Sequence, residues 1–265
     1  MKKKARRVYK DRDGNKLPSV TEILGGFGWK YQPLLAWANK IGREGKTLNE
    51  GSKDARDIGT CAHDLIEDFV LGRERRERED TPPDIWEGAL ISLASFKRFW
   101  LRENMSERCE VIGTETLMVD LDRGYGGTAD LFCLLDGEPA CLDFKTGKSI
   151  YAETAIQLEA YCDLWFVDGS KHVEDSDGKP LLAWQIEQRQ ENRAMKRTGI
   201  IHCPADGRET TLVEIPGEVR YASQQIWPRL VEMVRWKKPY DDFGKELRKL
   251  AKANEAEPPK PSTPF

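Results

Sequence analysis

Residues 127–145, GTADLFCLLDGEPACLDFK, carry the strongest indication of the fold. Two apolar runs flank the dipeptide Asp136-Gly137, which is typical of a two-residue hairpin turn. Both runs are apolar on both faces, a pattern that favours strands in the middle of a buried sheet. The sequence therefore predicts two neighbouring central strands, at about residues 128–135 and 139–145.

A turn at these two residues also fixes which side chains face each other. It pairs Leu135 with Glu138, and counting back along both strands pairs Asp130 with Asp143. Directly opposed side chains lie about 4.5–5.5 Å apart at Cβ, so the two carboxylates repel each other unless a cation lies between them. Because side chains alternate along a strand, Lys145 shares the face of Asp143.

Two acids and a lysine on one face indicate a metal-dependent phosphate chemistry. Carboxylate oxygens are ligands that Mg²⁺ and Mn²⁺ prefer. Such an ion lowers the pKa of a water molecule and stabilises phosphate charge, and Lys145 orients that water or neutralises the developing charge. The alternative is an ordinary surface hairpin with scattered charges, but apolar strands on both sides would leave those acids buried without partners.

Other polar residues are candidates for the same site. His63 lies on the helix expected at about 50–71, and Glu115 points toward the apolar face of a strand expected at 111–119. Gln157 and Tyr161 share one face of the next helix, where an amide and a phenol can hold a phosphate or a base. Each has a structural alternative, because a lone helical histidine and a polar helix face also serve packing.

Composition limits the classes of protein that the chain can represent. Hydrophobic residues make up 39% and charged residues 33%, which allows a core, and no apolar run approaches the roughly 20 residues that cross a bilayer. The net charge of −3 does not by itself indicate a nucleic-acid binder, and no secretory signal follows the basic N-terminus. The six cysteines form no C-x-x-C pair, so we expect buried, reduced thiols in a cytoplasm and no iron–sulfur cluster.

The rest of the chain alternates between helical and strand patterns. Ser19 to Glu22 has capping-box spacing, which predicts the start of a helix after a strand–turn at 8–18. Further helices are expected at 32–44, 84–103, 151–166, 217–236 and 240–254. Between them we expect a flexible turn at 124–127, a loop at 168–180, a strand or short helix at 181–188, and a hairpin formed by 199–203 and 210–215. The tail at 257–265 is expected to be disordered. This order predicts an α/β or α+β domain.

In their order along the chain, these residues resemble the PD-(D/E)XK nuclease superfamily in its RecB-like branch. The matching elements are a helical G-x-x-x-H at Gly59 and His63, a strand glutamate at Glu115, G-x-x-D ending at Asp130, D-x-K from Asp143 to Lys145, and Q-x-x-x-Y from Gln157 to Tyr161. Residues 17–24 and 35–37 are also similar to the N-terminal part of phage-type members and of the mitochondrial genome maintenance exonuclease.

The resemblance implies a restriction-endonuclease-like core, a mixed central sheet flanked by helices, with extra helices at both ends. We expect a single nuclease domain over 1–256, composed of a helical part (1–105), a catalytic core (106–216) and C-terminal helices (217–256).

The resemblance also implies the roles of the site residues. His63, Asp130, Asp143 and the carbonyl of Phe144 would bind Mg²⁺ or Mn²⁺, with Lys145 catalytic. Glu115 would lie at the edge of the site, as a ligand or behind one. Gln157 and Tyr161 would line the path of the DNA.

The expected activity is that of a metal-dependent DNA exonuclease in phage or bacterial recombination, repair or DNA degradation, in the host cytoplasm if phage-encoded. A structure-specific endonuclease of the same fold and a non-catalytic DNA-binding module remain alternatives. The chain carries no helicase motif, so a helicase, recombinase or single-strand-binding partner would be a separate chain, and no membrane partner is expected.

Overall fold

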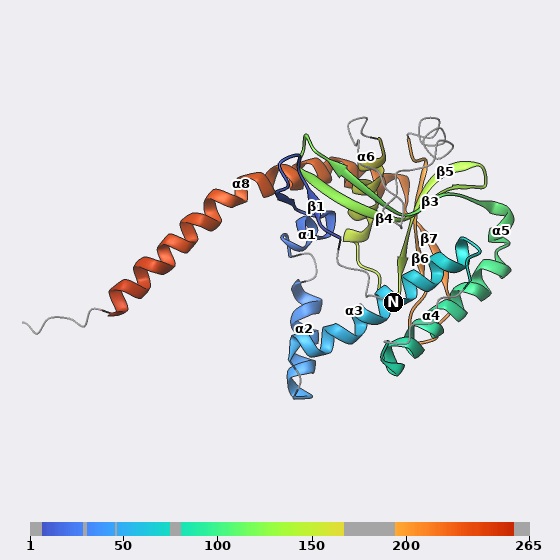
Figure 1. Ribbon diagram of the computed structural model, residues 1–265, viewed down its shortest axis with the longest axis horizontal. Helices are drawn as coiled ribbons and strands as arrows, with labels where there is room; N and C mark the ends of the chain where they lie inside the picture. Colours follow the sequence, from blue (N-terminus) through green and yellow to red (C-terminus); the bar gives the residue numbers. More distant parts are fainter. Residues whose placement is uncertain (1–6, 29–30, 46, 75–80, 167–193, 257–265) are drawn as a thin grey trace, which may run out of the picture.

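The computed structural model describes residues 7–28, 31–45, 47–74, 81–166 and 194–256. Within these ranges a mixed five-stranded sheet is flanked by helices on both faces (Figure 1). This arrangement confirms the predicted mixed α/β class. The predicted division into one domain with three parts stays a prediction.

The sheet has the strand order β3–β4–β5–β6–β7. Its strands are Cys109–Asp120 (β3), Tyr125–Leu135 (β4), Glu138–Lys145 (β5), Arg197–His202 (β6) and Thr211–Glu214 (β7). Neighbours run antiparallel except β5 and β6, which run parallel. The chain between these two strands includes α6 (Glu153–Phe166), the kind of long crossover that a parallel pair requires.

The turn between β4 and β5 is the one that the sequence predicted. Asp136 and Gly137 have φ angles of 54° and 80°, and positive φ at both central residues is what a type I′ turn requires. The register runs from Leu135 opposite Glu138 to Leu131 opposite Leu142, which confirms the predicted pairing.

Two helical layers cover the sheet and enclose separate halves of the core. On one face lie α3 (Leu48–Val70) and α4 (Pro83–Arg102), whose buried side chains pack with those of β4 and β5 such as Leu131 and Phe144. On the other face lie α6, α1 (Val20–Gly25) and the first part of α8 (Gly217–Ala256), which pack around Phe132 and Trp227. The four helices predicted over 50–71, 84–103, 151–166 and after Ser19 are thereby confirmed.

The N-terminal segment connects to the sheet through a small hairpin. Its strands are Tyr9–Lys10 (β1) and Lys16–Leu17 (β2), so the strand and turn predicted at 8–18 are present and a second strand completes a hairpin. Ser19 then caps α1 in the predicted capping box, because Ser19 Oγ accepts from the N–H of Glu22 and the N–H of Ser19 donates to Oε2 of Glu22. The carbonyl of Pro18 accepts from the N–H of Gly126 at 3.1 Å, which joins this segment to the start of β4.

The sequence-based prediction contains three errors along the chain, of which two are wrong expectations and one is a missed helix. The helices expected at 217–236 and 240–254 form one helix, α8, which continues through Pro228 and Pro239. A proline ring removes one backbone donor and bends a helix, but buried side chains such as Trp227 and Leu230 hold the first part of this one in place. The short α5 (Met105–Arg108) was not predicted.

The third error concerns the glycines at 124–127, which were expected to form a flexible turn. Only Gly124 lies in the turn, and β4 begins at Tyr125. Gly127 is a strand residue next to α6, where a Cβ would lie 2.8 Å from Cε1 of Tyr161. The glycine therefore permits close packing of helix on strand.

The remaining expectations have mixed outcomes. The helix expected at 32–44 is α2 (Tyr31–Arg43), and the hairpin expected at 199–203 and 210–215 is formed by β6 and β7. The loop at 168–180, the element at 181–188 and the tail at 257–265 lie outside the described residues. All six cysteines are free and buried, as expected. None of the helices in the described ranges combines the length and apolar character needed to cross a membrane.

Candidate active site

Three side chains of the kinds that can bind a metal ion converge from three elements beside the central strands. They are His63 on α3, Glu115 on β3 and Asp130 on β4. One ligand atom from each lies within 4.8 Å of the others. Nδ1 of His63 lies 3.5 Å from Oδ1 of Asp130 and 3.9 Å from Oε1 of Glu115, so the imidazole lies between the two carboxylates.

The strand register explains why the acids gather. The residue pairs on either side of Glu115 in the β3–β4 ladder set it opposite Asp130. The position beyond the Leu131–Leu142 pair sets Asp130 opposite Asp143 in the β4–β5 register. Adjacent strands lie about 4.8 Å apart, so the three carboxylates form a row across three neighbouring strands.

Phe144 positions both Asp130 and His63. Its N–H donates to Oδ2 of Asp130 at 2.7 Å, and its ring meets the His63 ring edge-on at a centroid distance of 5.8 Å. In an antiparallel pair the N–H and the C=O of one residue point to the same neighbouring strand. The Phe144 carbonyl, an expected ligand, therefore faces the β4 side of its strand, where Asp130 lies.

The other expected residues form a chain of contacts that begins at Asp143. Nζ of Lys145 lies 2.5 Å from Oδ2 of Asp143 and donates to Oε1 of Gln157 at 3.3 Å. Nε2 of Gln157 in turn donates to the hydroxyl of Tyr161 at 2.8 Å. Gln157 and Tyr161 share one face of α6, as the i, i+4 spacing predicted, and that face is turned toward Lys145.

Burial and charge act in opposite directions on His63 and Asp130. Burial alone would lower the pKa of His63, but the negative charges of Asp130, Glu115 and Asp143 outweigh it and raise this pKa to about 9. Burial would raise the pKa of Asp130, but the positive charges of His63 and Lys145 and the N–H of Phe144 lower it. Without a metal, a protonated imidazole therefore holds an ionised carboxylate.

Burial and neighbouring charges also act on the pKa values of Asp143 and Lys145, but with a different net result. Burial and the charge of Asp130 raise the pKa of Asp143, although Lys145 partly offsets them. Burial would lower the pKa of Lys145, but Asp143 and Asp130 outweigh it and raise that pKa. Lys145 is therefore an ammonium ion near neutral pH, and it can stabilise negative charge but cannot accept a proton. Burial also raises the pKa of Tyr161, so its phenol keeps its proton.

Arg7 is a residue that sequence reasoning missed. Its NH1 donates to the backbone carbonyl of Glu115 at 2.6 Å, and its NH2 lies 3.5 Å from Oε2 of the same residue. Glu115 has a φ of 45°, in the left-handed region that residues with a Cβ rarely adopt. The hydroxyls of Tyr9 and Thr128, 2.9 Å apart, lie beside this contact. No local signal marks Arg7, because its partner is 108 residues away.

The site thus brings all the expected residues into two adjoining groups. His63, Glu115 and Asp130 form a cluster of a kind that could hold a divalent cation, so Glu115 lies where the expected role as a ligand would place it. Asp143 lies next to this cluster but contacts Lys145. Two carboxylates and one imidazole are a donor set that fits Mn²⁺, and carboxylates also suit Mg²⁺.

No model of a known protein family matches the chain, and no curated protein matches it. Membership of the PD-(D/E)XK superfamily therefore stays a prediction from the motifs.

Proposed function

We propose that the protein is a divalent-metal-dependent nuclease that hydrolyses phosphodiester bonds in DNA, and that it acts as an exonuclease. The observation that carries the proposal is the convergence of His63, Glu115 and Asp130 within 4.8 Å, directly beside the Asp143–Lys145 pair. Asp130 is buried and Glu115 is half-buried, and carboxylates at such close range repel each other. A divalent cation between them would offset that repulsion.

The residues of the site are proposed to have different roles. His63, Glu115 and Asp130 would hold Mg²⁺ or Mn²⁺, with the Phe144 carbonyl and Asp143 beside them. The ion would supply Lewis acidity at a phosphate oxygen and lower the pKa of a nearby water molecule. Lys145, protonated next to Asp143, would stabilise the negative charge that develops on the phosphate as the bond breaks.

The hydrogen bonds of Gln157 support a role in orienting Lys145. Its amide oxygen accepts from the ammonium group, and its amide nitrogen donates to Tyr161. The same α6 face would meet the DNA backbone, where amides and phenols commonly contact phosphate. Gln157 and Tyr161 are therefore proposed to fix Lys145 and to line the path of the substrate.

The proposal extends to the setting of the enzyme. Six free, buried cysteines support a reducing compartment such as a bacterial or host cytoplasm. DNA is the proposed partner, and any helicase, recombinase or single-strand-binding protein would act as a separate chain in recombination, repair or DNA degradation.

The test uses end-labelled linear single- and double-stranded DNA beside a closed circle, each with Mg²⁺, Mn²⁺ or EDTA. An exonuclease degrades the linear DNA only, in the presence of metal only. Cleavage of the circle would instead identify an endonuclease. Binding without cleavage of any substrate would overturn the enzymatic proposal and favour a binding module.

Matched variants connect the activity to the site. Asp130→Asn and Asp143→Asn keep the shape of each side chain and remove its charge, so both are expected to abolish cleavage. Asp206→Asn, on the exposed turn between β6 and β7, serves as the control and is expected to cleave like the wild type. Activity retained in the Asp130 or Asp143 variant would contradict the assignment.

A further inference from the structure

The second part of α8 carries a regular row of large apolar side chains. Successive members of this row are alternately three and four residues apart. The row is called the heptad stripe and consists of Met233, Trp236, Tyr240, Phe243, Leu247 and Leu250. A strict alternation of this kind has a period of 3.5 residues and marks the a and d positions of a left-handed coiled coil.

The heptad stripe is exposed along its whole length. Trp236 is 67% and Tyr240 75% exposed, and the other four members are about half exposed or more. Upstream of the stripe, Trp227 and Leu230 anchor α8 in the core, whereas its C-terminal part extends away from the sheet and its helices (Figure 1). An exposed apolar row of this size is uncommon on a monomer and marks a binding surface.

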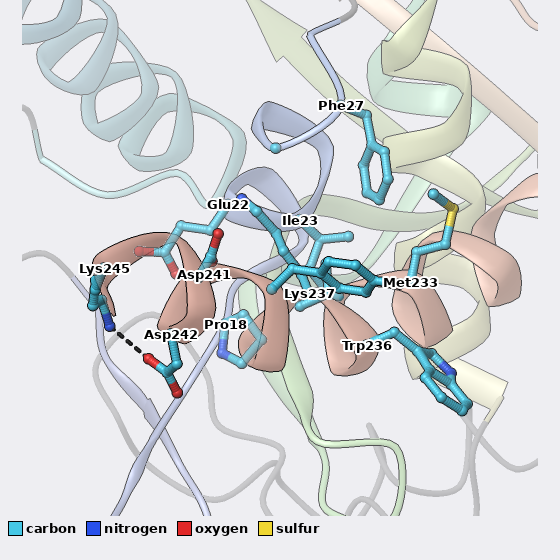
Figure 2. Close-up of a pocket in the computed structure, with 13 residues that line it drawn as sticks. Pro18, Glu22, Ile23, Phe27, Met233, Trp236, Lys237, Asp241, Asp242 and Lys245 are labelled. Carbon is cyan, nitrogen blue, oxygen red and sulfur yellow. Dashed lines mark hydrogen bonds and ion pairs between the residues drawn. The ribbon is translucent and has the colours of Figure 1, made fainter. Parts of the chain in front are cut away.

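A groove adjoins the N-terminal end of the stripe. It has a volume of about 630 Å³ and lies between α8 and the α1 region, with Ile23 and Phe27 opposite Met233 and Trp236 (Figure 2). The ion pair between Lys245 and Asp242, 2.7 Å apart, lies at its far end (Figure 2). A helix lying on the stripe would therefore also contact α1.

The residues beside the stripe indicate what that helix is. With Met233 as an a position, Glu232 is a g position and Lys237 an e position. In a parallel pair of identical helices, the g residue of one chain meets the e residue five positions further along in the other. Glu232 would therefore meet Lys237 of a second copy, and by symmetry Lys237 would meet Glu232 of that copy. Both side chains are exposed.

We propose that the heptad stripe is the interface of a homodimer, in which the two α8 helices form a parallel, in-register two-stranded coiled coil. A second copy is the occupant because the stripe matches itself in spacing and because the flanking pair of Glu232 and Lys237 is complementary in that register. The stripe is shorter than the roughly three to four heptads that a free-standing coiled coil needs. In the proposed dimer, the α8 helix of the second copy also contacts α1 across the groove, and this contact enlarges the interface. The proposal rests on helix geometry and is independent of the nuclease activity.

The first experiment measures the mass of the full chain by light scattering over a range of micromolar concentrations. The wild type is expected at twice the mass of one chain. Phe243→Glu with Leu247→Glu places charges on two exposed stripe positions and is expected to give monomers. Lys249→Gln with Lys252→Gln makes the same change in net charge at outward positions and is expected to remain dimeric. A monomeric wild type throughout, or a stripe variant that stays dimeric, would overturn the proposal.

The second experiment tests the register. All six native cysteines are buried, so Leu250→Cys introduces an exposed thiol at a d position. In the parallel register this thiol meets its copy, and mild oxidation is expected to link the two chains. Lys252→Cys, at an outward position, is expected not to link. An antiparallel pair would bring Leu250 opposite Met233, so a dimer in which Leu250→Cys does not cross-link would overturn the parallel arrangement.

Discussion

The guanidinium of Arg7 contacts Glu115 at two points, the backbone carbonyl at 2.6 Å and the carboxylate at 3.5 Å. Glu115 is thereby held with a φ of 45°, and its carboxylate lies beside His63 and Asp130. Because this conformation is unfavourable for a residue with a Cβ, it persists only where the surroundings enforce it. Arg7 therefore positions a proposed metal ligand.

Replacement of Arg7 by lysine should weaken metal binding. Arg7→Lys keeps the positive charge but loses the planar fork that reaches both oxygens. Loss of such a supporting contact typically costs 10- to 100-fold in metal affinity, and we expect a decrease of about 10-fold for Mn²⁺. The measurement is a Mn²⁺ titration followed by electron paramagnetic resonance. Arg12→Lys, on the exposed turn of the same hairpin, is the control, and equal affinities in the two variants would show that Glu115 needs no support from Arg7.

The donor set predicts a preference among metals. One imidazole and two carboxylates suit Mn²⁺ better than Mg²⁺, which favours oxygen ligands and retains its water. Mn²⁺ is therefore expected to bind more tightly than Mg²⁺ in calorimetric titrations. In His63→Gln, the difference between the affinities for the two ions is expected to become smaller. Equal affinities for the two ions in the wild type would indicate that His63 is not a ligand.

The metal-free protein should lose stability as the pH rises. The pKa of His63 is about 9 in the folded state, above the ordinary value near 6.5, so protonation of His63 favours folding. This stabilisation is fully present below about pH 6.5 and is lost as the pH rises through about 9. It amounts to about 2 kcal/mol when the pKa shift is reduced for solvent screening of a partly exposed ring.

Denaturant unfolding in EDTA at the two ends of this pH range measures the effect. The free energy of unfolding of the wild type should fall more than that of His63→Gln. If the free energy of unfolding falls equally with pH in the two proteins, His63 is not held protonated by its carboxylate neighbours.

Close packing at Gly127 gives a further test of the site. A Cβ there would lie 2.8 Å from Cε1 of Tyr161 and 2.9 Å from Cδ1 of Leu164. Gly127→Ala should therefore destabilise the fold by about 1–3 kcal/mol and displace Tyr161 from Gln157. Gly42→Ala, in α2 with nothing near the added Cβ, should be neutral or stabilising by up to about 1 kcal/mol. Thermal unfolding compares the two, and similar melting temperatures would argue against tight packing at Gly127.

Local patterns predicted the central hairpin because its determinants are adjacent in sequence. Asp136-Gly137 selects the turn, and the turn selects the register, which pairs Leu131 with Leu142. Asp130 and Asp143 are the next residues beyond that pair. The capping box at Ser19 is equally local, since both partners lie within three residues. Such features depend little on the rest of the chain.

The features that sequence reasoning missed depend on distant contacts. The β3–β4 register shifts between Val111 and Gly113, and this irregularity, with no local signal, precedes the unusual backbone of Glu115. Arg7 reaches the site only because the N-terminal segment bonds to β4 through Gly126. Only tertiary packing determines these outcomes.

The proposed nuclease activity is tested by the rate at which the wild type, Lys145→Ala and Lys148→Ala degrade end-labelled linear DNA in Mn²⁺. Lys148 is an exposed lysine three residues beyond Lys145 and controls for the loss of positive charge. We expect the wild type and Lys148→Ala to degrade the DNA at similar rates, and Lys145→Ala to be slower by at least about 10²-fold, as for the loss of a group that stabilises transition-state charge. Equal rates in the wild type and Lys145→Ala would show that Lys145 is not catalytic, and no degradation by the wild type would show that the protein is not this nuclease.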